Sequence, residues 1–393
     1  MGRHQAIVIG GGIGGLAAAL ALHRQGVPVT VHERAASLEP VGAGLALAPN
    51  ALRALDRLSV GARLRSLANS HPAVGLRHPS GRWLARTDTA TFEACFGDTI
   101  AAVARAEVIA ALVDALPEGT VRTDSPASLV SPGSATEPAV VRTPDGERSA
   151  ALVVAADGIR SATRGLLFPR HPGPRYSGFT TWRTIVTPAR RPAAVGEVWG
   201  RGRLAGVVPL ADGRVYVYGA ALAPAGTRAA AGDEKAELLR HYGTWCAPVP
   251  QLLALAEPDR VLRHDVWDLA DPLPAHHLGR VALLGDAAHA MCPFQGQGAC
   301  QAIEDAVVLA APLTPATDPV TTLPAYTAAR LPRTTAIVTG SRRIGDLVAL
   351  RTPVATLLRT TALTLVGLLP ARALLSRSAG TYDWQPPALG GAA

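Results

Sequence analysis

The first 35 residues constrain the fold of this chain more than any other segment. Apolar residues at Ala6–Ile9 predict a buried strand, and after a glycine-rich turn Leu16–Gln25 and Val27–His32 predict a helix and a second strand. A βαβ unit of this kind joins two parallel strands through a crossover helix. We therefore predict an α/β fold that binds its ligand where the strands of the sheet end.

The turn has the GxGxxG spacing of a dinucleotide-binding motif, whose glycines allow a tight turn, close approach of a pyrophosphate and close packing of helix against strand. Its residues are Gly10, Gly12, Ile13, Gly14 and Gly15. Glu33 follows at roughly the 20-residue offset of an acid that binds a ribose 2′-hydroxyl, and we include its neighbour Arg34 in the site. Because an acid there disfavours a 2′-phosphate, we predict that the ligand is NAD or FAD.

A second glycine-rich segment lies at Val281–Ala306. Its apolar beginning predicts a buried strand that ends at an acid, and its turn precedes a predicted helix at Ala299–Ala310. A carboxylate at a strand end can bind sugar hydroxyls, and the free N–H groups at a helix start favour negative charge. We predict that a reduced, anionic flavin is stabilised here; the alternative is a structural corner with a solvated acid. The predicted residues are Gly285, Asp286, Pro293, Gly296, Gln297 and Gly298.

Length and charge limit the other functions open to the chain. With 393 residues, 48% of them hydrophobic, it can form two domains or one large body with an inserted layer, and it is not disordered. Residues 330–393 contain eight arginines against two acids. These arginines lie several residues apart in helical, leucine-rich sequence, so we interpret them as a solvated helical face and expect no nucleic-acid partner.

The four cysteines form no CxxC pair and no signal peptide is evident, so we expect free thiols, no metal site and a cytoplasmic protein. Val348–Leu369 is the longest apolar stretch, but Arg351 and Arg359 interrupt it, and we expect no integral membrane segment. The Pro/Gly/Ala-rich tail after Trp384 is expected to be disordered.

Three further segments place polar groups or glycines beside apolar runs. Gly44 and Leu45 follow the second strand, where a simple dehydrogenase would continue with another regular βα repeat. A helix is predicted to begin at Arg105, and a buried strand is predicted to end at Asp157 and Gly158.

Taken together, three motifs resemble those of the single-component (class A) FAD-dependent aromatic hydroxylases, the family of the para-hydroxybenzoate and salicylate hydroxylases. They are GxGxxG at Gly10–Gly15, Asp157-Gly158, and Gly285-Asp286 with its proline and glycine tail. The resemblance covers about residues 5–335. It implies a Rossmann-like FAD-binding domain, an inserted β-sheet substrate domain and a helical C-terminal segment. The expected divisions are 1–70, 100–174 and 281–335 for FAD, 71–99 and 175–280 for substrate, and 336–393 for the C-terminal helices and tail.

The resemblance also implies roles for single residues. Glu33 is expected to bind the ribose of FAD, Arg105 its linker and Asp286 its ribityl chain. Asp157 and Arg160 are expected to serve both the FAD pyrophosphate and NAD(P)H. Three segments are expected to line the isoalloxazine: Gly44–Asn50 with its Leu45, the Pro293 backbone, and the helix start at Gly296–Gly298. One departure is an alanine before Arg105, where many relatives have histidine.

The region at 175–280 is predicted to be rich in strands and to contain the substrate groups. Alternation places Tyr216 and Tyr218 on one face, where they either orient a phenol or carbonyl or cover the outer surface of the sheet. Arg183 is our candidate for contact with a substrate anion or the flavin. His289 is expected to be a structural hydrogen-bonding group and Cys292 a packing residue.

The resemblance implies a monooxygenase. NADH or NADPH would reduce FAD, O2 would add to form a flavin hydroperoxide, and one oxygen atom would enter an aromatic, polycyclic or other electron-rich small molecule. Hydroxylation, epoxidation and Baeyer–Villiger insertion stay open, as do a monomer and a homodimer. The alternatives are an FAD-dependent reductase of an isoprenoid-type double bond, a non-catalytic flavin-binding protein, and a NAD-dependent dehydrogenase without flavin.

Overall fold

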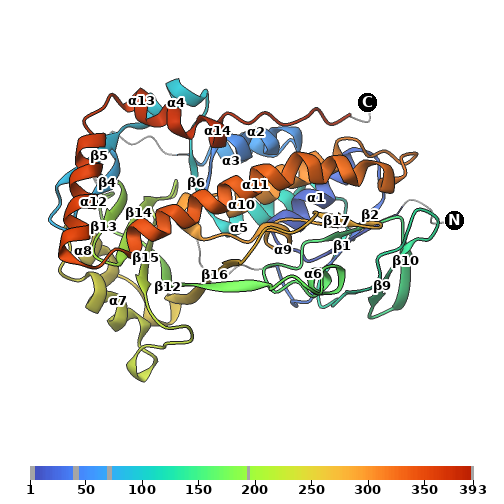
Figure 1. The fold of residues 1–393 in the computed structure, drawn as a ribbon, viewed down its shortest axis with the longest axis horizontal. Coiled ribbons are helices and arrows are strands. Elements are labelled where there is room, and N and C mark those ends of the chain that lie inside the picture. The colour runs from blue at the N-terminus through green and yellow to red at the C-terminus, as the bar shows by residue number, and fades with distance from the viewer. Residues whose placement is uncertain (1–4, 39–43, 69–72, 193–194, 391–393) are drawn as a thin grey trace.

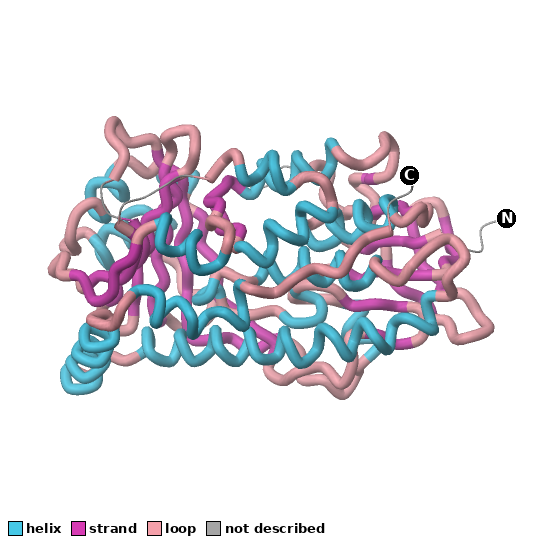
Figure 2. Tube along the Cα trace, turned by 90° about the horizontal axis from the view of Figure 1, so that it is seen from above, coloured by secondary structure: helices cyan, strands magenta, loops and turns pink. Residues whose placement is uncertain are grey.

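The strands of the molecule form two groups, with helices between and along them (Figures 1 and 2). The computed structural model describes residues 5–38, 44–68, 73–192 and 195–390. The first group is a six-stranded sheet in the order β17-β18-β11-β1-β2-β7. Its strands are β1 (Ala6–Ile9), β2 (Val29–His32), β7 (Val121–Arg122), β11 (Leu152–Ala155), β17 (His277–Leu278) and β18 (Val281–Leu283). All neighbours in this sheet pair in parallel except β17 and β18.

Both faces of this sheet are covered, which explains why β1 is apolar at every position. Ala6 and Val8 face a core formed with helices, whereas Ile7 and Ile9 face a second core on the opposite side. The first face is covered by α1 (Ile13–Arg24), α5 (Arg105–Asp114) and α10 (Gly298–Ala310). The second is covered by a small sheet of β8 (Ser128–Ser131), β9 (Ala139–Thr143) and β10 (Gly146–Ala150), with α6 (Ala162–Leu167) and α9 (Asp286–His289). The predicted α/β class is confirmed.

The second group is a seven-stranded sheet in the order β16-β12-β15-β14-β13-β4-β5. Its strands are β4 (Val74–Arg77), β5 (Trp83–Thr87), β12 (Pro174–Val186), β13 (Val195–Trp199), β14 (Arg203–Pro209), β15 (Val215–Leu222) and β16 (Leu262–Leu269). Helices α7 (Glu234–Tyr242) and α8 (Val249–Ala254) cover one face through a core that includes Val217. The opposite face, with Tyr218, turns toward the nucleotide-binding half.

A smaller set of elements joins the two sheets. It comprises β3 (Gly44–Leu47) paired with β6 (Ala101–Ala104), and α2 (Pro49–Arg57), α3 (Gly61–Arg65) and α4 (Thr89–Phe96). The C-terminal elements are α11 (Pro319–Ala349), α12 (Pro353–Val366), α13 (Ala371–Leu375) and α14 (Ala379–Tyr382). In Figure 1, α11 runs along the long axis from one sheet to the other.

The C-terminal helices and tail differ in two respects from what the sequence predicts. The division at residue 335 falls inside α11, because this helix packs continuously along both halves. The boundary at 70/71 lies outside the described residues, and the division into domains stays a prediction. The tail after Trp384 was expected to be disordered, but within its described residues, 385–390, Leu389 packs against the main core. Trp384, directly before the tail, packs against the same core and lies 5.6 Å from the guanidinium of Arg333. This cation–π contact and the apolar contacts fix the chain from Trp384 to Leu389.

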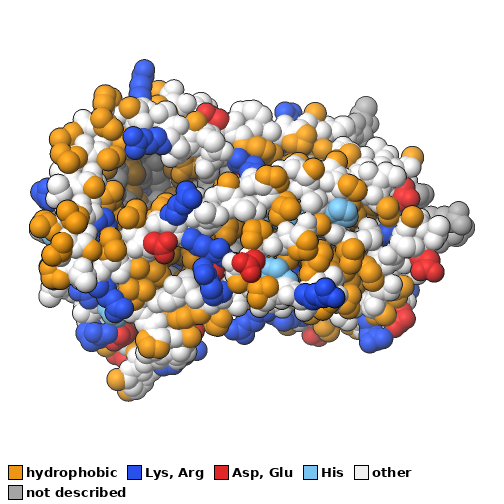
Figure 3. Space-filling view, viewed as in Figure 1, with side chains coloured by type: hydrophobic (Ala, Val, Ile, Leu, Met, Phe, Trp, Pro, Cys, Tyr) orange, Lys and Arg blue, Asp and Glu red, His pale blue; other side chains and the backbone are white. Residues whose placement is uncertain are grey.

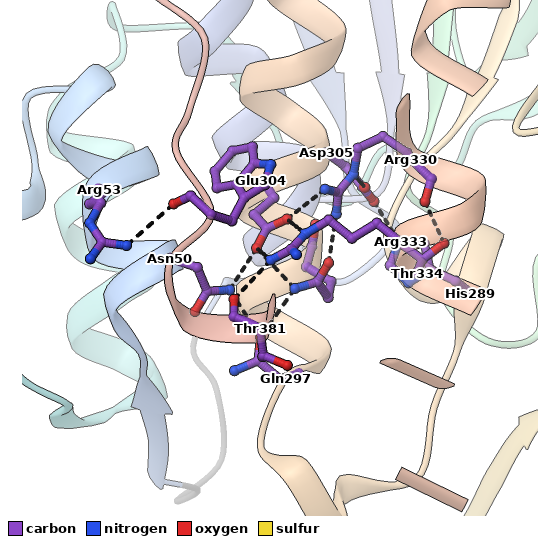
Figure 4. A network of polar contacts seen from close by, with 12 residues as sticks. Asn50, Arg53, His289, Gln297, Glu304, Asp305, Arg330, Arg333, Thr334 and Thr381 are labelled. Carbon is purple, nitrogen blue, oxygen red and sulfur yellow. Dashed lines mark hydrogen bonds and ion pairs between the residues drawn. The ribbon is translucent and has the colours of Figure 1, made fainter. Parts of the chain in front are cut away.

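A buried ionic network ties α10 to α11 (Figure 4). The guanidinium of Arg330 is fully buried, with its Nε 2.6 Å from Asp305 and its Nη1 2.5 Å from Glu304. Asn50 on α2 also donates to Glu304, at 2.6 Å. Burial alone raises the pKa of Asp305, but His289 and Arg330 outweigh burial and lower it, so this carboxyl stays ionised. The network therefore fixes three helices relative to one another.

The variant Arg330→Ala tests this network. Removing one partner of a buried ion pair leaves uncompensated charges, so we expect the free energy of unfolding to fall by about 3–5 kcal/mol. Urea unfolding followed by far-UV circular dichroism measures the loss. Arg343→Ala, at an exposed position on the same helix, is the matched control and should stay within about 0.5 kcal/mol of the parent. Equal stability of the two variants would contradict the role of the network.

Candidate active site

A cavity of about 430 Å³ connects the two halves of the molecule. It begins at the glycine turn after β1 and ends against the seven-stranded sheet. The residues expected from the sequence that line it are Gly12, Ile13, Gly14, Gly15, Gly44, Leu45, Arg105, Arg183, Tyr216, Tyr218, Gly285, Asp286, Pro293, Gly296 and Gly298. Those that do not line it are Gly10, Glu33, Arg34, Asp157, Arg160 and Gln297.

The glycine turn is tightly packed at Gly10 and Gly15, whereas its backbone is accessible at Gly12. Gly10 has a φ of +106°, and a Cβ on Gly15 would lie 1.9 Å from the Gly10 carbonyl oxygen. A Cβ on Gly12, in contrast, would meet nothing nearer than a terminal nitrogen of Arg105 at 3.9 Å. The turn therefore packs tightly against the sheet while its backbone at Gly12 stays accessible, as a pyrophosphate requires.

Glu33 lies beside this turn and is already hydrogen-bonded. One carboxylate oxygen accepts from the Gly11 backbone N–H at 2.6 Å and the other from the Ala35 N–H at 2.9 Å. The side chain of Arg34 is exposed to solvent. Ribose binding by Glu33 stays a prediction.

Asp286 faces the cavity at the end of β18, among cationic groups. Its enclosure by protein raises the pKa of its carboxyl, whereas His289, Arg105 and Arg164 lower it. Burial likewise lowers the pKa of Arg105, and the charge of Asp286 raises it. The two side chains thus compensate one another electrostatically across the part of the cavity nearest the glycine turn.

Sequence reasoning singled out Arg160 but missed Arg164 on α6. Arg160 is exposed, whereas Arg164 is buried and donates to the carbonyl oxygens of Ala287 at 3.0 Å and Ile159 at 2.6 Å. Asp157 accepts from the Thr163 N–H at 3.1 Å, and its other oxygen is buried without a hydrogen-bond partner among the described residues. Nothing in the sequence distinguished the two arginines, because their burial depends on packing between α6 and α9.

The second glycine-rich segment forms a short 3-10 turn, Pro293–Gln295, before α10 begins at Gly298. The helix begins one residue before the expected Ala299, and no side chain caps its first N–H groups. Gln297 points away from the cavity into the ionic network, where its oxygen accepts from Asn50 at 3.0 Å. The hydrogen bond from Asn50 fixes Gln297 on the side away from the cavity. The uncapped backbone N–H groups at the start of the helix are therefore available on the cavity side.

The substrate-side wall is built from adjacent strands of the seven-stranded sheet. Tyr216 and Tyr218 both line the cavity. Of the two orientations considered, these tyrosines therefore face the pocket and do not cover the outer surface of the sheet. The Tyr218 hydroxyl donates to Glu197 at 2.7 Å, and the Trp199 indole N–H donates to the other oxygen of Glu197 at 2.7 Å. Arg183 pairs with Tyr218 across β12 and β15. Glu197 lines the cavity and was not singled out by sequence.

The ionisation of this wall is set by burial. Burial raises the pKa of Glu197, although its hydrogen bonds to Tyr218 and Trp199 act in the opposite direction. Burial and the neighbouring Glu197 raise the pKa of Tyr218 well above its ordinary value. The phenol of Tyr218 therefore keeps its proton and directs it to Glu197.

His289 and Cys292 were expected to have structural roles, and both make polar contacts behind the cavity, but Cys292 also lines the cavity. His289 lies behind Asp286 with its Nε2 2.6 Å from Asp305. Cys292 is buried, its Sγ lies 3.7 Å from Asp268, and burial raises its pKa to about 12, which keeps it a thiol.

Comparison with known proteins identifies the family. A family model described as an FAD binding domain matches residues 3–341. The chain is 35% identical to the aurachin C monooxygenase/isomerase of Stigmatella aurantiaca, over 87% of this chain and 88% of that protein. It is 32% identical to an FAD-dependent urate hydroxylase of Klebsiella pneumoniae, over 87% and 90%. The chain belongs to the FAD-dependent aromatic hydroxylases.

A solved structure is similar throughout. The complex of Klebsiella pneumoniae HpxO with FAD and uric acid superposes with a TM-score of 0.88 at 28% identity, covering 97% of each chain. The predicted FAD cofactor and the predicted monooxygenase activity are confirmed, which excludes the dehydrogenase alternative.

The variant Asp286→Ala tests the FAD site. Loss of the carboxylate at the end of β18 removes the acceptor that we expect the ribityl hydroxyls to use, so the purified protein should contain at least tenfold less FAD per chain. Absorbance at the flavin bands measures the content. Asp346→Ala, exposed on α11, is the control and should bind FAD as the parent does. Full retention of FAD by Asp286→Ala would remove this residue from the site.

Proposed function

We propose that the cavity binds FAD along its length and that the enzyme inserts one oxygen atom of O2 into an aromatic, electron-rich small molecule, with NADH or NADPH as reductant. One observation carries this proposal. The open glycine turn, Asp286 and the start of α10 share one cavity with the wall of Glu197 and Tyr218. A cofactor held by the first three groups would have its reactive end beside the wall.

The described residues fit FAD. The accessible backbone at Gly12 and the side chain of Arg105 suit the pyrophosphate, and Asp286 suits the ribityl hydroxyls. The start of α10, uncapped by a side chain, suits negative charge on the pyrimidine edge of the ring. When bound, FAD supplies the redox chemistry between NAD(P)H, O2 and the substrate. The chain positions the reactants, excludes water and compensates charge.

The wall also supports an inference about the kind of substrate. Since the Tyr218 hydroxyl donates its hydrogen bond to Glu197, its oxygen is left to accept a hydrogen bond from the cavity. We infer that the substrate ring carries an O–H or N–H donor, which Tyr218 orients and makes more electron-rich. Uric acid, the ligand of the similar HpxO structure, carries N–H donors. Arg183 lines the same cavity and would balance negative charge that develops at this end of it.

The reaction can be tested by anaerobic reduction of the bound flavin. NADH and NADPH are compared with and without a panel of phenols, indoles and polycyclic aromatics, and the bleaching rate is recorded. We expect one donor-bearing compound to accelerate bleaching at least tenfold and to gain one oxygen atom when air is admitted. Substrate that returns reduced and not oxygenated would indicate an isoprenoid-type reductase. Absence of bleaching by either nucleotide would indicate a flavin-binding protein.

The direction of the Tyr218 hydrogen bond gives a sharper test. In Glu197→Gln the amide oxygen must accept from Trp199, so the amide N–H donates to Tyr218 and the phenol proton turns to the cavity. We expect kcat/KM for the donor substrate to fall by about 10–100-fold, the range of one lost hydrogen bond, with FAD content unchanged.

The matched control is Tyr176→Phe, which removes a hydroxyl from the same sheet. That hydroxyl donates to the Ala223 carbonyl at 2.6 Å, and Tyr176 does not line the cavity. It should leave kcat/KM within about twofold, as expected for a change that leaves the site intact. Equal effects of the two variants would contradict a directional role for Glu197.

A further inference from the structure

The outer face of α12 and the turn after it carries exposed apolar side chains. We call them the α12 stripe: Val354, Leu357, Leu358, Leu365 and Leu368, each between 61% and 76% exposed. Apolar side chains gather at the left-hand end of the molecule, over α12, in Figure 3. A contiguous exposed patch of this kind marks an interaction surface more often than scattered single residues do.

The helix that presents the stripe is firmly attached. Positions 354, 358 and 365 are four and seven residues apart, which places them on one side of a helix. The opposite side is buried, and Arg359 donates from it to the Gly200 carbonyl at 2.8 Å, with its guanidinium 5.8 Å from the Trp199 ring. The apolar side chains therefore project outward from a fixed helix.

Cations surround the stripe. Arg351 lies before α12, and Arg372 and Arg377 lie after it; all three are exposed, and none forms an ion pair within the part of the chain that the structure describes. Arg82, from the β4–β5 hairpin, reaches the Thr364 hydroxyl at 3.4 Å. The sequence from residue 347 to residue 382 contains no acid. This segment of the surface therefore combines apolar side chains with basic ones and contributes no acid.

We propose that the α12 stripe docks on an anionic lipid bilayer, with α12 lying in the interface. Leucines would enter the acyl boundary and the arginines would meet lipid phosphates. A second copy of the chain fits less well, because a two-fold axis would bring the arginines of one copy against those of the other without an acid from this segment. Within the described residues no single helix is long and apolar enough to cross a membrane, and α12 with the helices after it passes that test only as a pair bent by 120°. Docking is independent of the proposed reaction.

The test is co-sedimentation of the FAD-loaded full chain with vesicles. Vesicles of equal parts phosphatidylglycerol and phosphatidylcholine should pellet the protein at least tenfold better than phosphatidylcholine alone, and 0.5 M NaCl should weaken binding, since salt screens exposed charges. The triple variant Leu357→Gln/Leu358→Gln/Leu365→Gln should lose at least tenfold in bound fraction. Leu255→Gln/Leu278→Gln, which changes exposed leucines elsewhere, should bind as the parent does.

A second variant separates charge from apolar contact and guards against misfolding of the first. Arg372→Ser/Arg377→Ser keeps the leucines and should lose the preference for phosphatidylglycerol, with FAD content and melting temperature unchanged. The proposal is overturned if the parent pellets with neither vesicle, or if both variants bind as the parent does. It is also overturned if light scattering shows a dimer that the triple variant dissociates while no vesicle binds, because a second copy then covers the stripe.

Discussion

The position of the proposed flavin site depends on one buried carboxylate, Asp305. Its Oδ2 accepts from the Gly285 backbone N–H at 2.9 Å and lies 2.6 Å from His289 Nε2, while Oδ1 meets Arg330. Gly285 and His289 flank Asp286 at the end of β18. One side chain on α10 therefore fixes both the acid at the strand end and, through Arg330, the helix α11. Its charge is compatible with burial only because every oxygen has a partner.

Helix α11 contacts both the nucleotide-binding half and the substrate half of the molecule. It packs beside α10 in the nucleotide-binding half, and its later residues reach the core that contains Phe294 and Tyr218. The residues that would hold the reactive end of the flavin and the residues of the substrate wall lie far apart in the chain. The distance between them therefore depends on elements that span both sheets. A cavity shared by two rigid sheets suits a reaction in which positioning and exclusion of water matter more than protein acids and bases.

Local patterns made much of the fold predictable, and long-range packing limited the rest. The βαβ unit and the strand that ends at Asp286 depend on residues close in sequence, and the spacing of their motifs carried the family resemblance. Alternation placed Tyr216 and Tyr218 on one face, but only the packing of α7 and α8 on the other face decides that they look into the cavity. Glu197 lies in an ordinary strand, and its role arises from Trp199 and a tyrosine 21 residues away. The composition of the tail predicted disorder, because the contacts of Trp384 with Arg333 on α11 and of Leu389 with the core depend on residues far away in the sequence.

We propose that FAD extends from the glycine turn to the wall of Glu197 and Tyr218 through one cavity. A crystal structure of the FAD-loaded enzyme would show this arrangement directly. We expect the pyrophosphate at Gly12 and Arg105, and the isoalloxazine beside the start of α10 with one edge toward Tyr218. An isoalloxazine outside the cavity, or one separated from the wall by protein, would contradict the proposed FAD site.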